Sequence, residues 1–115
     1  MNVSFLGYEE SIATFEADSA VKTGNLVKIS GNGRVSACAS KDEFCGVAVD
    51  VRNGYASVQL KGYVEVPYTG SAVPSLGYST LSAGSATQVT SVTSGGRSLL
   101  VVNKDETNTK VGIIL

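Results

Sequence analysis

The residue types that most often carry catalysis are scarce in this chain, and those present are not arranged as catalytic sets. There is no histidine, so the commonest general base is missing and a Ser-His-Asp triad cannot form. The acidic pairs Glu9-Glu10 and Asp42-Glu43 could share acid and base roles, but neighbouring side chains on a strand or turn point apart. No serine lies in a Gly-x-Ser-x-Gly motif. We therefore predict that the protein is not an enzyme and has no catalytic residue.

The cysteines and the glycine-rich segments do not predict a metal or cofactor site. Cys38 and Cys45 flank a segment that could form a turn between two strands. A cross-strand disulfide is geometrically possible there, but a reducing compartment favours two small buried thiols. Two thiols do not complete a tetrahedral zinc site. Segments 31–33 and 95–96 lack the Lys-Ser/Thr of a phosphate loop, and 105–108 lacks the Gly and final Glu of a calcium loop. We expect no metal and no cofactor.

Length and charge restrict the class of protein further. The chain has 115 residues, of which 43% are hydrophobic and 17% charged, and its formal net charge is −1. This is enough for one domain with one core. Nucleic acids and anionic membranes are bound through clustered Lys and Arg, which this balance does not offer. No segment resembles a signal peptide or approaches the ~20 apolar residues of a membrane span. We expect a soluble protein made in a cytoplasm, with no nucleic-acid or membrane partner.

Residues 55–66 form the stretch around which the other elements must be placed. Every even position is apolar or Gly, and every odd position is polar or amphipathic. A period of two predicts a β-strand with one buried and one solvent-facing side. At ~3.3 Å per residue this strand would be about twice the usual length, so Gly62 is expected to mark a bend or bulge. Asn53-Gly54 predicts a turn before the strand, and Pro67 predicts its end.

Short strands separated by Gly, Asn and Ser turns account for most of the remaining chain. No stretch has the period of a long amphipathic helix. The pattern predicts an all-β protein, a small β-barrel or sandwich, with an extended N-terminal arm over residues 1–12 and a single β domain over 13–115. The strands expected before the midpoint are 12–17 with Ala13, Phe15 and Ala17 buried, 26–29, 34–38, and 46–51 with Val47, Val49 and Val51 buried.

The second half of the chain repeats the pattern of the first. The offset of about 52 to 55 residues predicts an approximate internal duplication, with halves 13–66 and 67–115 that close on one core. The matching segments are 20–24 with 72–77, 26–29 with 78–81, and 58–60 with 113–115, while 87–92 and 99–102 supply the middle strands of the second half.

Two further features favour a contact surface. Segment 66–96 contains no charged residue, and twelve of its residues are Ser or Thr. Such a surface can contact another protein without burying unpaired charges, although a half-buried neutral hairpin region explains the same composition. The apolar residues of the arm could fold against their own domain or reach a neighbouring subunit or partner. Tyrosines on a polar face could serve in a contact or simply cover the barrel. The interface candidates are Phe5, Leu6, Tyr8, Tyr55, Tyr63, Tyr68 and Tyr78, and the loops 40–45 and 103–110 are expected to be more solvent-exposed.

Several segments together resemble a family of small phage and prophage proteins. They are IATFEAD at 12–18, VKTGNLVKI at 21–29, GRV at 33–35, GVA at 46–48, VQLKGYVEV at 58–66 and GIIL at 112–115. The family is encoded among virion morphogenesis genes, and its members are similar to head decoration, or cement, proteins. The resemblance implies a β module that binds the outside of an assembled capsid, as a trimer or dimer, and holds neighbouring capsomers together. Its partner would be the major capsid protein, and its location the capsid exterior of the virion.

Two other functions fit the same pattern of strands. One is a phage tail or fibre-base module, with a similar fold and a different partner. The other is a carrier or accessory β domain of an enzyme, similar to the lipoyl-type hammerhead, in which a modified lysine lies at a hairpin tip. The nearest counterpart of that lysine is Lys104 in Asn103-Lys104-Asp105, which lacks the acidic residue before the lysine.

Overall fold

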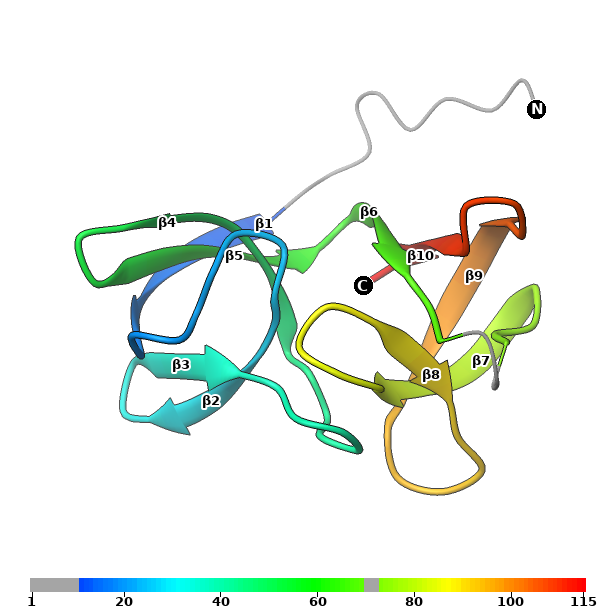
Figure 1. Ribbon diagram of the computed structural model, residues 1–115, viewed down its shortest axis with the longest axis horizontal. Helices are drawn as coiled ribbons and strands as arrows, with labels where there is room; N and C mark the ends of the chain where they lie inside the picture. Colours follow the sequence, from blue (N-terminus) through cyan, green and yellow to red (C-terminus); the bar gives the residue numbers. More distant parts are fainter. Residues whose placement is uncertain (1–10, 70–72) are drawn as a thin grey trace.

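The computed structural model describes residues 11–69 and 73–115, in which every regular element is a β-strand (Figure 1). The expected all-β fold is therefore confirmed. No helix of this part is long and apolar enough to cross a membrane. The ten strands are β1 (Ser11–Ala17), β2 (Leu26–Gly31), β3 (Arg34–Ala37), β4 (Gly46–Arg52), β5 (Tyr55–Lys61), β6 (Tyr63–Pro67), β7 (Gly77–Ala83), β8 (Val89–Ser91), β9 (Arg97–Asp105) and β10 (Lys110–Ile114).

The first five strands close into a barrel in the order β1-β3-β2-β4-β5. The ring closes because β1 pairs in parallel with β3 on one side and antiparallel with β5 on the other. Five strands enclose a narrow space, which suits the small and β-branched side chains that the alternating pattern directs inward. The buried interior consists of Ala17, Val21, Val27, Val35, Ala48, Ala56 and Val58.

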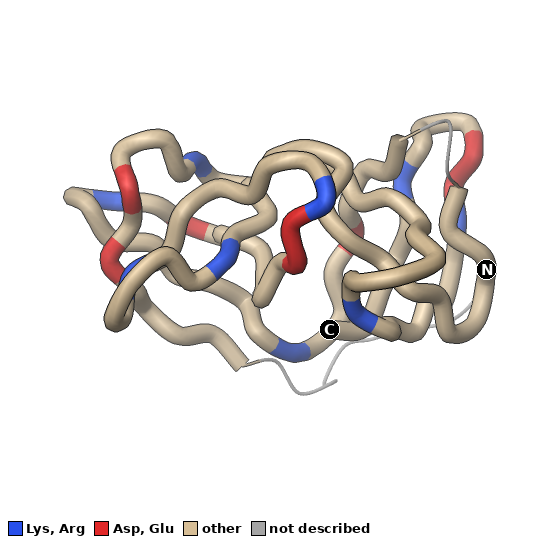
Figure 2. Tube along the Cα trace, turned by 90° about the horizontal axis from the view of Figure 1, so that it is seen from below, with Lys and Arg blue, Asp and Glu red and all other residues tan. Residues whose placement is uncertain are grey.

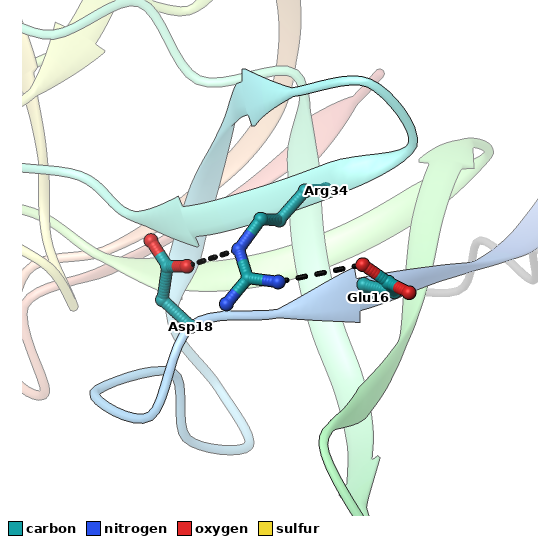
Figure 3. Close-up of polar contacts among 3 residues, drawn as sticks. All are labelled: Glu16, Asp18 and Arg34. Atoms are coloured by element: carbon teal, nitrogen blue, oxygen red, sulfur yellow. Dashed lines mark hydrogen bonds and ion pairs between the residues drawn. The ribbon is translucent and has the colours of Figure 1, made fainter.

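The short parallel ladder between β1 and β3 is accompanied by an ion-pair cluster on the barrel surface (Figure 3). Arg34 donates from Nε to Asp18 at 2.6 Å, and its Nη1 lies 3.4 Å from the carboxylate of Glu16. The hydrogen bond that Arg34 donates to Asp18 holds the pKa of Arg34 above its ordinary value. Because all three side chains are well exposed, water screens their attraction. We interpret the cluster as a clamp on the ladder.

The remaining strands form a second sheet in the order β6-β10-β9-β7-β8, with antiparallel pairing throughout. Its two edges approach each other beyond β6, where Tyr68 and Val89 form a single parallel bridge. The Thr69 N–H also donates to the Val89 carbonyl at 3.0 Å. Read around the sheet from β6 in the opposite direction, the order is β6, β8, β7, β9 and β10, and each strand matches the barrel strand five places earlier in the chain. The parallel contact beyond β6 with β8 matches that between β1 and β3. This arrangement is the internal duplication that the sequence predicts, although the second sheet begins at Tyr63 rather than at residue 67, so that β6 belongs to the second half.

Local irregularities recur at equivalent positions in both halves. In β4, Val49 is an extra residue opposite β5, since Ala48 and Asp50 pair with adjacent residues of that strand. In β9, Val102 is the extra residue opposite β10. The turns that lead into β2 and β7 contain Gly24 and Gly77, with φ of 92° and 88°. A bulge changes the twist and curvature of a strand, so its recurrence 53 residues later indicates that both sheets curve in the same way.

The stretch 55–66 is two strands rather than the one long strand that its alternation predicts. β5 belongs to the barrel and β6 to the second sheet, and Gly62 lies between them with φ of 104°. The prediction of a bend at Gly62 is confirmed. The alternation continues across the break because each strand buries its even positions in its own half, so the pattern alone did not reveal the change of sheet.

Gln59 is the second correction to this stretch. Its odd position predicts a solvent-facing side chain, but it is only 5% exposed. Its Nε2 donates to the carbonyls of Lys61 and Tyr63, each at 3.1 Å. The buried amide thus satisfies two backbone acceptors on either side of Gly62. We interpret Gln59 as the clamp that holds the junction between the two halves.

The bulge in β4 also corrects the predicted core. Val47, Val49 and Val51 were expected to share the buried side, but Val49 is 38% exposed. Because the extra residue shifts the phase of the strand, the side chain of Val49 is turned away from the interior. In β1 the expected alternation is found, with Ala13, Phe15 and Ala17 more buried than the residues between them.

The structure has two hydrophobic clusters where the sequence predicted one core. One is the barrel interior, and the other, which we call the shared core, takes side chains from both halves. Leu26, Cys38 and Phe44 from the first half are buried together with residues of β6 to β10. The segment 38–45 also pairs with the end of β7, because the Lys41 N–H donates to the Ala83 carbonyl at 2.8 Å and the Ala83 N–H donates back to Asp42 at 2.9 Å. Of the loop 40–45, which was expected to be solvent-exposed, Ser40, Lys41 and Glu43 are exposed, whereas Phe44 is buried and the expectation was wrong for it.

Charged side chains make further contacts with segment 38–45. Arg97 of β9 places its guanidinium 5.8 Å from the ring centre of Phe44 and donates to the Phe44 carbonyl at 3.2 Å. Lys28 of β2 contacts Asp42 at 2.6 Å. Elsewhere, positive and negative residues are interspersed along the molecule (Figure 2). The loop 103–110 carries mostly exposed side chains, as expected.

Candidate interaction surface

The two cysteine side chains are held as protonated thiols. Cys38 and Cys45 are both free thiols, the first in the shared core and the second against the barrel interior. Burial raises the pKa of Cys38 to about 11, and it raises the pKa of Cys45 as well. A nucleophilic or metal-binding thiol needs a lowered pKa. Within the described ranges, no three His, Cys, Asp or Glu side chains gather as possible metal ligands.

The most distinctive surface lies on the outer side of the second sheet. Tyr78 of β7 is directly opposite Leu100 of β9, and Leu100 is directly opposite Ile114 of β10. Ile114 is in turn opposite Tyr63 of β6. Directly paired residues project from the same side of a sheet, so these four side chains cross four neighbouring strands. We call Tyr63, Ile114, Leu100 and Tyr78 the outer apolar row.

The row is most exposed at Tyr78 and partly buried toward Tyr63. Tyr78 is 77% exposed, whereas Leu100, Ile114 and Tyr63 are partly buried. A shallow cleft of about 490 Å³ runs beside Tyr78, Leu100 and Ile114. Leu76, immediately before β7, is 62% exposed. Binding surfaces often combine an exposed aromatic side chain with apolar neighbours.

Tyr63 has its own local role within the row. A methyl group at Gly112 would overlap the Tyr63 hydroxyl and the Asn103 amide, so the ring covers the glycine. Asn103 Nδ2 donates to the Tyr63 hydroxyl at 3.0 Å, and that hydroxyl lies 3.3 Å from the Glu65 carboxylate, to which it donates. Burial raises the pKa of Tyr63, although the hydrogen bond from Asn103 opposes this. The ring is therefore fixed, and its outer edge extends the row.

No member of the outer apolar row carries a formal charge at neutral pH. The tyrosines provide rigid rings with polar tips, and the two aliphatic side chains provide area that can be desolvated at little cost. Chemically, this arrangement is suited to binding another apolar surface. It does not offer a group that could transfer a proton or attack a substrate near neutral pH.

The other candidates from the sequence lie in different places. Tyr55 is 52% exposed on the barrel, where it pairs with Arg52 and Glu16. Tyr68 is 4% exposed and belongs to the shared core, so we leave it out of the surface. The structure brings Tyr63 and Tyr78 into one row and does not bring Tyr55 to it. Phe5, Leu6 and Tyr8 lie outside the described residues.

Leu100 and Ile114 complete the row, and sequence reasoning did not single them out. Both lie in short runs in which consecutive residues are all apolar, 99–102 and 113–115. A fully apolar run is typical of a strand buried on both sides. The same run on a strand whose outer side is open leaves apolar side chains exposed. The signal was therefore present, but it does not distinguish burial from a binding surface.

The described part of the neutral segment 66–96 contains both buried and exposed apolar side chains. Leu81, Ala83 and Val89 are buried in the shared core, and Tyr78 and Leu76 are among the most exposed apolar side chains. Lys104, the counterpart of a carrier lysine, pairs with Val111 within the ladder of β9 and β10 rather than at a hairpin tip.

Comparison with known proteins adds no identification. No protein-family model matches the chain, and no curated protein matches it significantly.

Proposed function

We propose that this protein is a structural component of a phage virion, a decoration or cement protein that binds the outer surface of an assembled head. In this proposal the outer apolar row contacts the major capsid protein or a sister subunit, and the bound copies hold neighbouring capsomers together. The proposal rests on the family resemblance of residues 12–66 and on the exposed row. The row is the observation that carries it, because its most exposed member, Tyr78, lies beside apolar side chains of the two neighbouring strands β9 and β10.

The construction of the fold supports such a role. The barrel and the second sheet are joined by a hydrophobic cluster with side chains from both halves, by Gln59 and by the segment 38–45. A block of this kind presents its surface with little loss of conformational entropy on binding. Many identical copies on a lattice also gain from multivalency, so each individual contact can be modest. Self-association as a trimer or dimer would increase this effect.

The direct test is binding to heads that lack decoration. Labelled protein is mixed with purified undecorated heads of the phage or prophage that encodes it, and the heads are sedimented. We expect saturable co-sedimentation that Tyr78→Ser weakens and Tyr55→Ser does not, since Tyr55 is exposed but lies outside the row. Failure of the wild-type protein to co-sediment would count against cement function. Binding to isolated tails instead of heads would support a tail or fibre-base module.

The oligomeric state supplies a second test. Light scattering of the purified protein is expected to give the mass of a dimer or trimer of the 11.8 kDa chain. A strict monomer at high concentration would weaken the proposal. Intact mass from the native host addresses the carrier-domain alternative, because a modification on Lys104 would add to the mass of the chain.

A further inference from the structure

A second cleft lies between the two halves, away from the outer apolar row. It has a volume of about 380 Å³ and is bounded by Lys41 of the first half and by the loop between β8 and β9. The loop is held close to segment 38–45, since the Gly96 N–H donates to the Glu43 carboxylate at 3.1 Å. The polar groups that line the cleft belong to Lys41, Ser82, Ser91, Thr93, Ser94 and Gly96.

Ser82 is the residue that the fold alone does not explain. Its side chain is 2% exposed, and its hydroxyl has no hydrogen-bond partner among the described residues. A buried hydroxyl without a partner costs on the order of 1 to 3 kcal/mol, and most such groups in proteins are satisfied. Because Ser82 lines the cleft, an atom bound there is the available partner.

Lys41 is the single charged residue along this cleft, and it forms no ion pair with any residue in 11–69 or 73–115. Its acidic neighbours are already engaged. Asp42 accepts from Lys28 at 2.6 Å and from the Ala39 N–H at 2.8 Å, which keeps its pKa below the ordinary value. Glu43 accepts from Gly96 and lines a different cleft. The ammonium group of Lys41 is therefore left to interact with whatever enters.

The backbone holds Lys41 in place at some cost. Its φ is 73°, a left-handed conformation that is uncommon for a residue other than glycine. The hydrogen bond from its N–H to Ala83 keeps the backbone in this conformation. Gly96, on the opposite wall, has φ of 75°, and a methyl group there would meet the Leu81 carbonyl at 2.6 Å. Both walls of the cleft are thus shaped by constrained backbone.

The chemistry of the lining defines the ligand. One ammonium and several hydroxyl groups are donors, and none of the lining residues is aromatic or acidic. Sugars and nucleobases are usually bound by stacking on aromatic rings, which this cleft lacks. A single positive charge matches a singly charged carboxylate better than a phosphate of about −2. We propose that this cleft binds a carboxylate group, with Lys41 and the Ser82 hydroxyl as its principal donors.

This site stands independently of the proposed virion function. A carboxylate could come from an acidic side chain of a protein partner or from a small organic acid, and the cleft recognises the shared group. The Ser82 hydroxyl is buried, so this hydrogen bond requires the residues that line the cleft to move when the carboxylate binds. Two charge-assisted hydrogen bonds, from Lys41 and from Ser82, would then form in a partly desolvated setting.

The test is a titration of the full-length, 15N-labelled protein with sodium acetate, observed by amide chemical shifts. Sodium chloride at the same ionic strength is the reference for simple screening. We expect saturable shifts at Lys41, Ser82 and 93–96, with an acetate Kd on the order of millimolar, as suits so small a ligand. Lys41→Gln is expected to weaken binding by about tenfold or more, and Ser82→Ala by about threefold to tenfold.

The stability of Ser82→Ala and a control variant provide further tests of the site. Ser82→Ala removes a hydroxyl without a partner, so its thermal stability should equal or exceed that of the wild type. Lys22→Gln, at an exposed lysine of the barrel, is the matched control and should leave the acetate titration unchanged. Shifts that chloride reproduces, or a Kd that Lys41→Gln leaves unchanged, would overturn the site. A phosphate affinity ten times that of acetate would overturn the assignment to carboxylates.

Discussion

The ring of Tyr63 lies over Gly112, so that an aromatic side chain of β6 fills the space that a side chain of β10 would occupy. The two residues are two positions out of direct register, since Gly112 pairs with Glu65 and Tyr63 pairs with Ile114. Glycine in a strand contributes no packing of its own, and a neighbouring aromatic ring can supply that packing. This contact fixes the buried end of the outer apolar row.

A double-mutant cycle tests this relationship. Gly112→Ala should lower the free energy of unfolding by about 1 to 3 kcal/mol, because the methyl group forces Tyr63 and Asn103 to move. Tyr63→Ala should cost about 2 kcal/mol through lost packing. In the double variant the methyl group has room, so we expect a coupling energy of at least about 1 kcal/mol in denaturant unfolding. Additive effects would show that the ring does not cover the glycine.

The junction at Gly62 depends on a hydrogen-bond donor at position 59. Gln59→Glu replaces that donor with a carboxylate facing the carbonyls of Lys61 and Tyr63. We expect the free energy of unfolding at pH 7 to fall by about 2 to 4 kcal/mol. Part of the loss should return in acid, because a protonated carboxyl group can donate to one carbonyl.

Gln59→Met is the control for the clamp, because it has similar length and no ionisable group. It should cost about 1 to 3 kcal/mol at every pH, since both carbonyls lose their donor. Unfolding followed by circular dichroism between pH 4 and pH 8 distinguishes the two variants. Wild-type stability of Gln59→Glu at neutral pH would disprove the clamp.

Tyr78 should matter for binding and not for folding. Tyr78→Ser removes a side chain that is 77% exposed, so the free energy of unfolding should change by no more than about 0.5 kcal/mol. In the sedimentation assay with undecorated heads, or in self-association, the same change should weaken the interaction by about tenfold or more. Tyr55→Ser provides the matched control on the barrel. Equal binding by both variants would place the contact surface elsewhere.

Stability should decline in alkaline solution, with Cys38 as one cause. An unfolded thiol loses its proton near pH 9, whereas burial raises the pKa of folded Cys38 to about 11. The folded state therefore holds this proton more firmly than the unfolded state does. The stability that the Cys38 thiol contributes is complete below pH 9 and is lost as the pH rises toward 11. Two pH units correspond to about 2 to 3 kcal/mol.

Cys38→Ala isolates the contribution of this thiol. Tyr63 also has a raised pKa and should add to the decline in the same direction. Thermal unfolding of both proteins between pH 8 and pH 11 should give a shallower curve for Cys38→Ala. Parallel curves would show that Cys38 does not cause the decline.

Much of this architecture could be predicted from local patterns. Alternation over 12–17 and 55–66 gave strands, and Gly and Asn gave turns, because side-chain direction and backbone freedom are properties of neighbouring residues. The repeat at about 52 to 55 residues predicted the duplication, which the equal strand order of the two sheets bears out. Of the surface, Tyr63 and Tyr78 were named, and Leu100 and Ile114 were not.

By itself, the sequence determined the strand class, the turns and the duplication, since these depend on residues close together in the chain. Only the tertiary structure decided that the chain changes sheets at Gly62, that Val49 turns outward, that Tyr68 is buried and Tyr78 is not, and that Lys41 and Ser82 share a cleft. The physical reason is that burial is set by what covers a side chain. In this protein many of the covering residues are far away in the sequence, and some of them come from the other half.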